Sequence, residues 1–148
     1  VLIGGDYHYT YTIVSKLDGL NSSEADDYKE DYRESRLREL SLLRYDIEVG
    51  GISIPELNNA HVGTDRDTQI NLGQVKQAMD VDNNLTVEWK MNGDFNTLNK
   101  LAVDAMYAAV VTHKQLCFAN EKKLTLDINN ASDIAALDAI DLDAGWPA

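Results

Sequence analysis

Apolar residues recur along the chain with two different periods, which predict where strands and helices lie. From Tyr7 to Val14 every second residue is aromatic or aliphatic, which is typical of a β-strand. Farther on, residues 21–23 can cap a helix, and Gly50-Gly51 can end it because helix C-termini favour glycine. Between these two signals a helical stripe is formed by Leu37, Leu40, Leu43 and Ile47.

Two β-hairpins are predicted in the middle of the chain. The first pairs residues 52–54 with residues 61–63 across a turn that contains Pro55, Asn58 and Asn59. The second begins with the alternating run from Leu85 to Met91 and turns at Asn92-Gly93. Asparagine and glycine both tolerate the positive φ angles of a tight turn, so this second hairpin has the stronger signal.

A medium-length and a short helix are also expected, each from a capping residue followed by apolar positions at helical spacing. The medium-length helix begins at Thr64 or Asp65 and is expected to bury Ile70, Val75 and Met79. The short helix lies near the C-terminus, is expected to be capped by Ser132, and buries Ile134, Leu137 and Ile140.

The longest helix is expected to follow Thr97, which would cap it, and to carry two adjacent apolar stripes. Two stripes would bury the helix on a wide front, either in the core or in an oligomer interface. One stripe consists of Leu98, Leu101, Ala105, Ala108, Thr112 and Leu116, and the other consists of Ala102, Met106, Val110, His113 and Cys117.

These elements predict an α+β fold class, with short antiparallel β-hairpins attached to helices and one long central or C-terminal helix. Strands that return through tight turns pair antiparallel, which argues against a doubly wound parallel sheet. Residues 1–36 hold the N-terminal strand and the start of the first helix, a candidate attachment segment. Residues 37–148 form the main α+β domain, and both parts are expected to fold as one compact unit.

The charge of the chain excludes one broad class of partner. Its 148 residues include 13 lysines and arginines against 25 aspartates and glutamates, for a net charge of -12. Such a field repels phosphate backbones, so nucleic acid is not expected as a partner. No apolar run is long enough for a spanning helix, so no membrane insertion is expected. The single cysteine, Cys117, suits a reducing cytosol.

The chain carries no sequence motif of a catalytic site. It lacks a Gly-x-Ser-x-Gly elbow and a Walker-type glycine loop, and Cys117 lies among apolar neighbours as an inert thiol. Its three histidines lie far apart, which argues against a metal site: His8, His61 and His113. We therefore expect no enzyme, no catalytic residue, no metal and no cofactor. A hydrolase acting on polysaccharide would need a cleft with two opposed carboxylates.

A series of short segments in a fixed order carries a family resemblance. The series is Gly50-Gly51-Ile52, Thr64-Asp65-Arg66 with Gln69, Val87-Glu88-Trp89-Lys90, a helix with His113, Cys117-Phe118 and Glu121, and Gly145-Trp146-Pro147. It resembles an uncharacterised domain of tailed-bacteriophage and prophage proteins, of the tail-fibre or tail-fibre-assembly type. The resemblance covers roughly residue 37 to the C-terminus. The tyrosine-rich first strand and the long connection from Pro55 to Ala60 depart from it.

The resemblance implies a virion protein of the phage tail, tail fibre or baseplate, made in the cytoplasm of the host bacterium. Such a protein would bind other tail or fibre proteins, or itself as a homo-oligomer, without catalysis. The contacts would use the spare stripe of the longest helix or the edge of the first strand. Aromatic and cationic residues concentrate at binding hot spots, so the candidate partner-binding residues are Tyr7, Tyr9, Tyr11, Arg66, Gln69, Trp89, Lys90 and Trp146.

Two alternatives remain open beside this hypothesis. The first is a tail-fibre assembly chaperone that shields fibre surfaces and is not retained in the virion. The second, from another class, is an acidic DNA mimic that inhibits a host protein, which would need carboxylates at phosphate-like spacing.

Overall fold

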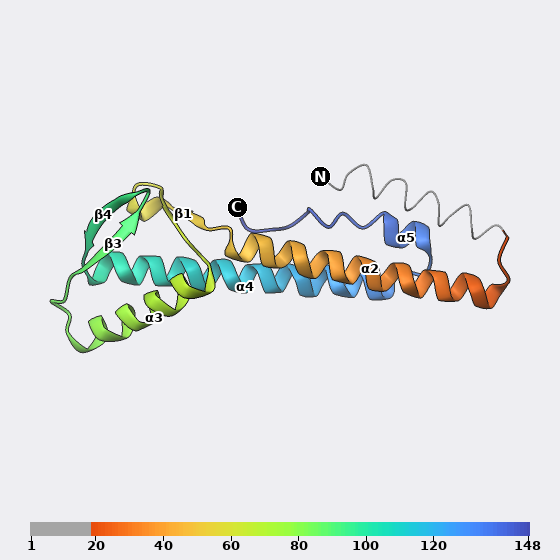
Figure 1. Ribbon diagram of the computed structural model, residues 1–148, viewed down its shortest axis with the longest axis horizontal. Coiled ribbons are helices and arrows are strands. Elements are labelled where there is room, and N and C mark those ends of the chain that lie inside the picture. Colours follow the sequence, from red (N-terminus) through yellow and green to blue (C-terminus); the bar gives the residue numbers. More distant parts are fainter. Residues whose placement is uncertain (1–18) are drawn as a thin grey trace. The chain divides into compact units, whose positions relative to one another are not determined.

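The computed structural model of the chain describes residues 19–148 and shows helices with two short antiparallel hairpins (Figure 1). The predicted α+β fold class is therefore confirmed. The strand expected from Tyr7 to Val14, with the candidates Tyr7, Tyr9 and Tyr11, lies outside the described residues. The elements are α2 (Ser22–Val49), β1 (Ile52–Ile54), the 3-10 turn η1 (Pro55–Leu57), β2 (Ala60–Val62), α3 (Arg66–Val81), β3 (Val87–Met91), β4 (Asp94–Leu98), α4 (Lys100–Asn130) and α5 (Ile134–Asp138).

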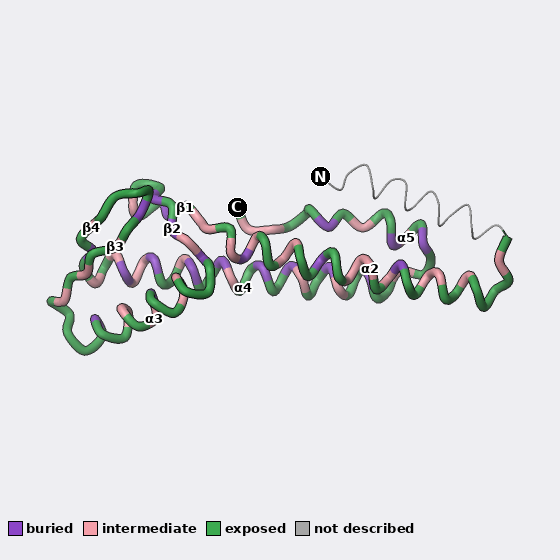
Figure 2. Tube along the Cα trace, in the orientation of Figure 1, coloured by how far each residue is buried: buried purple, intermediate pink, exposed green. Residues whose placement is uncertain are grey.

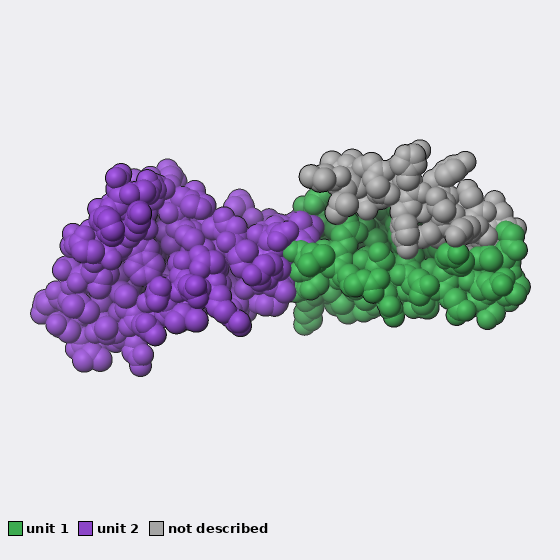
Figure 3. Space-filling model, in the orientation of Figure 1, with its two compact units in different colours: residues 1–42, 121–144 green, residues 43–120, 145–148 purple. Residues whose placement is uncertain are grey.

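The chain divides into two compact units (Figure 3). Unit 1 contains residues 1–42 and 121–144, so its described part holds most of α2, the end of α4 and α5. Unit 2 contains residues 43–120 and 145–148, so it holds the end of α2, both hairpins, α3, most of α4 and the C-terminal segment. Both α2 and α4 therefore contribute residues to each unit.

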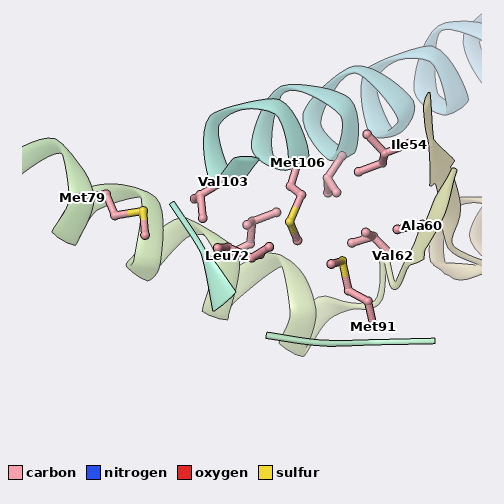
Figure 4. Close-up of a cluster of buried hydrophobic side chains, with 10 residues drawn as sticks. Ile54, Ala60, Val62, Leu72, Met79, Met91, Val103 and Met106 are labelled. Carbon is pink, nitrogen blue, oxygen red and sulfur yellow. The ribbon is translucent and has the colours of Figure 1, made fainter. Parts of the chain in front are cut away.

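Unit 2 is built around one hydrophobic cluster supplied by both hairpins, α3 and α4 (Figure 4). Figure 4 shows Met106 of α4 pointing toward α3, which contributes Leu72. Burial of a valine, leucine, isoleucine or methionine side chain contributes roughly 1.5–3 kcal/mol, so this cluster is a major source of stability for the unit. Its buried members are Ile54, Ala60, Val62, Leu72, Met79, Met91, Leu98, Val103, Met106 and Val110.

Unit 1 is held by side chains of α2 that bind the end of α4 and the region of α5. Arg33 donates from Nη1 to the carbonyl of Ile128 and from Nη2 to that of Ala131, at 2.9 Å for the second bond. Ile128 lies in the last turn of α4 and Ala131 directly follows the helix, so Arg33 binds two carbonyls at the C-terminal end of α4. Tyr32 donates to Asp138 Oδ1 at 2.9 Å. The buried apolar residues here are Tyr32, Leu40, Leu124, Ile128, Ile134, Leu137 and Leu142.

Both predicted hairpins are confirmed, although the second strand of the first hairpin is Ala60–Val62 rather than residues 61–63. Ile52 pairs with Val62 in the first, and Val87 pairs with Leu98 in the second. Asn92 and Gly93 have φ angles of 53° and 88°, the positive values that a two-residue hairpin turn requires. Asn58 and Asn59 also have positive φ, because η1 and the residues after it close the first hairpin.

Two of the predicted helix caps are wrong by one or two residues. Thr97 lies within β4 and donates to Glu88 across the hairpin at 2.6 Å, so Asn99 caps α4 by accepting from Ala102 N at 3.0 Å. Asp133, rather than Ser132, caps α5. The cap predicted at residues 21–23 is confirmed, since Asn21 Oδ1 accepts from Glu24 N at 3.0 Å, and Glu24 returns the bond to Asn21 N.

Buried and exposed residues alternate along α4 (Figure 2), and the two stripes predicted for it differ: the stripe with Met106 is largely buried, whereas most of the stripe with Leu101 is exposed, apart from Leu98 of β4 and the half-buried Ala105. Met106, Val110, His113 and Cys117 are buried as predicted, whereas Leu101 is 78% exposed and Leu116 is 50% exposed. On α3, Met79 is buried as predicted, but Ile70 is exposed and Leu72 takes the core position. Within the described residues, no helix is apolar enough over a sufficient length to cross a membrane, as expected.

The carboxylate of Asp65 caps α3, as one of the two predicted alternatives. It accepts from Thr68 N at Oδ1, 2.9 Å, and from Thr68 Oγ1 at Oδ2, 2.6 Å. The hydroxyl bond, followed by the amide bond, holds the pKa of Asp65 below its ordinary value of 3.8. A lowered pKa contributes stability above pH 3.8 that is lost as the pH falls through the folded-state pKa.

Asp65→Asn should therefore destabilise the chain in a pH-dependent way, because the amide keeps an acceptor oxygen but has no charge. We expect the free energy of unfolding to fall by about 0.5 kcal/mol near neutral pH and the difference to vanish near about pH 2. Urea unfolding followed by circular dichroism at both pH values measures this. Asp94→Asn, which removes an exposed charge from β4, is the control. A difference that is the same at both pH values would contradict the assignment.

Candidate functional site

A buried charged network lies in unit 2 where the end of α2 faces α4. Glu48 is only 7% exposed and forms an ion pair with Arg44 Nη1, one turn earlier on α2. Its other oxygen, Oε1, lies 3.7 Å from Lys114 Nζ of α4. The Arg44 guanidinium also lies over the ring of Phe118, 4.7 Å from its centroid. Two cations thus compensate one buried carboxylate and connect α2 to α4.

Gln69, one of the predicted partner-binding residues, extends this network to α3. Its Oε1 accepts from Lys114 Nζ at 3.0 Å, and its Nε2 donates to the carbonyl of Thr64 at 2.6 Å. The hydroxyl of Thr64, which is buried, accepts in turn from Gly51 N at 2.9 Å. Gln69 therefore links three segments inside unit 2.

His113 and Cys117 lie one turn apart on the buried face of α4. His113 Nε2 lies 3.0 Å from the carbonyl of Ile47, and because a carbonyl only accepts, Nε2 carries the hydrogen. Cys117 Sγ lies 3.7 Å from the same nitrogen. Burial, and then the charge of Glu48, raise the pKa of the Cys117 thiol, against a smaller lowering by Arg44. The thiol is thus kept protonated, which makes it a poor nucleophile.

A pocket of about 470 Å³ opens in unit 2 beside α4. One wall is the exposed stripe of α4, the second is β1 with η1, and the third is the end of the chain. Four residues of the stripe that was expected to be buried, in the core or in an oligomer interface, line this pocket: Ala105, Ala108, Thr112 and Leu116. The other lining residues are Ile52, Ser53, Glu56, Ala109, His113, Pro147 and Ala148.

The C-terminal segment reaches this wall through a glycine turn. Gly145 has a φ of 84°, and a Cβ added there would lie 2.5 Å from Asn120 Oδ1 on α4. Both the backbone angle and the close approach therefore require glycine. Trp146, one of the predicted partner-binding residues, follows it and is half-buried in unit 2, and its role in partner binding stays a prediction.

The remaining predicted partner-binding residues occupy different surfaces of unit 2. Trp89 is half-buried and packs against the hydrophobic cluster, whereas its neighbour Lys90 is exposed with Nζ 5.8 Å from the Phe95 ring centroid. Strand alternation therefore directs these two side chains to opposite faces. Arg66 is exposed in the first turn of α3. Their joint role in partner binding stays a prediction.

Two lysines and two aspartates form an exposed ion-pair network that ties α3 to α4. Asp80 Oδ1 lies 2.6 Å from Lys76 Nζ and 2.5 Å from Lys100 Nζ, and both lysines lie 3.3 Å from the carboxylate of Asp104. The Lys100 bond, followed by the Lys76 bond, lowers the pKa of Asp80, and Asp80 raises the pKa of Lys76. Within residues 19–148, no group of three or more histidine, cysteine or acidic residues could hold a metal ion.

Comparison with known proteins places most of the chain in one family. The model of a family described as Domain of unknown function (DUF4376) matches residues 31–143. This range takes in the charged network and the α4 wall of the pocket. No curated protein and no solved structure matches the chain.

Proposed function

We propose that this chain, which belongs to the DUF4376 family of domains of unknown function, is a non-enzymatic structural or adaptor protein of a bacteriophage tail, tail fibre or baseplate. The phage setting rests on the resemblance carried by the ordered segments from Gly50 to Pro147. Its mode of action, contact with other proteins, rests on the uncovered stripe of α4.

That stripe is the observation that best supports a binding role. Leu101 and Leu116 are large apolar residues with 78% and 50% of their surface exposed, and Ala108 between them is exposed as well. Exposed apolar surface that is continuous along an element marks interaction sites more often than single exposed residues do. Further large apolar residues exposed on α4 are Tyr107, Val111, Phe118 and Leu126.

The use of the buried ionisable groups also supports a structural role. Glu48 is neutralised by Arg44 and Lys114, and the Cys117 thiol has a raised pKa. A nucleophile prepared for catalysis is activated by a neighbouring base or has a lowered pKa, which is the opposite of the Cys117 thiol. The charged network thus connects α2, α3 and α4 within unit 2, which suits a role in holding the outer stripe of α4 in place for a partner.

The decisive experiment asks whether the chain is retained in finished particles. We expect mass spectrometry of washed virions to detect it at a fixed ratio to one tail protein, and chemical cross-linking to join it to that neighbour. If the chain is missing from washed particles but bound to free fibre protein in infected cells, the chaperone alternative is correct and the structural role is wrong.

A substitution on the exposed stripe of α4 tests whether this surface makes the contact that retains the chain in particles. Leu116→Asp places a charge on the exposed stripe without entering the core, so we expect particle retention to drop at least about tenfold while the melting temperature stays unchanged. Val81→Asp, at the exposed end of α3, is the matched control. Normal retention of Leu116→Asp would show that another surface makes the contact.

A further inference from the structure

The pocket beside α4 has the size of a binding site, and the charged side chains of its lining are acidic only. Its volume of about 470 Å³ exceeds that of a single side chain and falls in the range of about 300–1,000 Å³ typical of ligand sites. The lining contains one acidic side chain, that of Glu56, and contains neither lysine nor arginine. Within the described part of the chain, no ion pair reaches Glu56. The pocket therefore has an acidic rim without its own counterion.

The lining also contains polar groups that can accept hydrogen bonds. Because Nε2 of His113 donates to the Ile47 carbonyl, Nδ1 is the acceptor nitrogen of the neutral ring. Nδ1 is buried and has no hydrogen-bond partner among the described residues. The hydroxyls of Ser53 and Thr112 can accept hydrogen bonds as well. Because Nδ1 is buried, the groups that an occupant can reach are the carboxylate of Glu56 and the two hydroxyls, and these favour an occupant that brings donors and positive charge.

The rest of the lining is apolar, and several of its side chains are small. Three alanines of α4 project little from the helix, so an aliphatic chain can lie against the helix backbone: Ala105, Ala108 and Ala109. Leu116 and Pro147 close the apolar part. Lysine and arginine have long aliphatic stems that pack on apolar surface while the charged end stays in a polar environment.

We infer that this pocket receives a basic side chain of a partner protein, carried on a short apolar segment, with the charged end paired to Glu56 and the stem along the α4 alanines. The inference rests on the proposed function, since it names the chemistry of the partner that the α4 stripe binds. The net charge of -12 on the chain favours the same kind of partner, because the long-range field attracts basic segments.

A peptide titration tests this without virions, so its outcome is independent of particle retention. The probe is the capped tripeptide acetyl-Leu-Arg-Leu-amide. In the control peptide citrulline replaces the arginine, because citrulline has nearly the same shape but no charge. Both are titrated into the full 148-residue chain labelled with ¹⁵N and followed by NMR. We expect saturable shifts at Ser53, Glu56 and Thr112 with the arginine peptide, and an affinity for the citrulline peptide lower by about fivefold.

Two variants with matched controls identify the site. Glu56→Gln should weaken the arginine peptide about fivefold, to the level of the citrulline peptide, whereas Asp94→Asn removes the same charge from β4 and should have no effect. Ala108→Phe fills the pocket from an exposed position and should abolish the shifts, whereas Ala119→Phe, exposed on α4 outside the lining, should not. The amide spectra of the free variants establish that each is folded.

The possible results separate the inference from the proposed function. Equal affinities of the two peptides would overturn the basic-partner inference, and so would shifts that survive Ala108→Phe or an absence of saturable shifts at the pocket. None of these results bears on retention in particles. Loss of the chain from washed particles would refute the structural role and would leave a measured preference for the arginine peptide as a property of the pocket.

Discussion

Replacing Glu48 by alanine is expected to lower the free energy of unfolding by about 2 kcal/mol. The substitution removes the one carboxylate between Arg44 and Lys114, which leaves two cations facing each other in a partly buried site. Breaking a fully buried pair costs roughly 3–5 kcal/mol, and the lower value applies here because both cations retain some contact with water. Urea unfolding of the full chain, followed by circular dichroism, measures the change.

A second pair on the same helix provides the control for Glu48→Ala. Glu34 and Arg38 have the same four-residue spacing, with 3.8 Å between Arg38 Nη1 and Glu34 Oε2, but both side chains are about 70% exposed. Glu34→Ala should therefore change the stability by less than about 0.5 kcal/mol. If both substitutions had equal effects, the charged network of unit 2 would not be the support for α2 and α4 that we describe.

Met106→Ala should destabilise the chain by about 3 kcal/mol, because it leaves a cavity in the hydrophobic cluster of unit 2. Met106 is fully buried, so the loss includes both the transfer of its side chain from water and the contacts that surround it. Thermal and urea unfolding should both show the shift without a change in helix content at low temperature.

Leu101→Ala, on the same helix, distinguishes the two stripes of α4. From its spacing, Leu101 was expected to be buried in the core or in an oligomer interface, yet most of its surface is exposed in the chain, so this truncation should change the stability by less than about 0.5 kcal/mol. A large loss from Leu101→Ala together with a small loss from Met106→Ala would mean that the helix buries the opposite face.

Local signals predicted the elements well, because the forces that form them act within a few residues. Asn92-Gly93 prescribes its turn through its own φ angles, and Gly50-Gly51 ends α2 in the same way. The residues that cap the helices were harder to predict. Thr97 has the chemistry of a cap, but β4 continues to Leu98 in register with β3, so the helix starts later and Asn99 caps it.

The choice between the two stripes of α4 could not be made from the sequence. Both have helical spacing and apolar residues, and burial depends on the side from which α3 and the hairpins approach. The small residues Ala105 and Ala108 of the stripe leave room beside the helix, and the pocket occupies that room.

The candidate site was predicted only in part. Gln69 was selected for partner binding, and its contacts with Lys114 and Thr64 make it an internal link of unit 2. Glu48 was not selected, because an acidic residue in a charged helix is usually solvated. Its burial depends on Lys114, which lies far away in the sequence, although the four-residue spacing from Arg44 was visible.

Because Cys117 is buried, the reactivity of its thiol can report local opening of the chain without any added label site. This is the single sulfhydryl in the sequence, it is fully buried, and it lies on the face of α4 that contacts α2 through His113. A maleimide can therefore alkylate it only after the two helices part locally. The alkylation rate in native buffer reports the frequency of that opening, and a bound partner that clamps α4 would slow it.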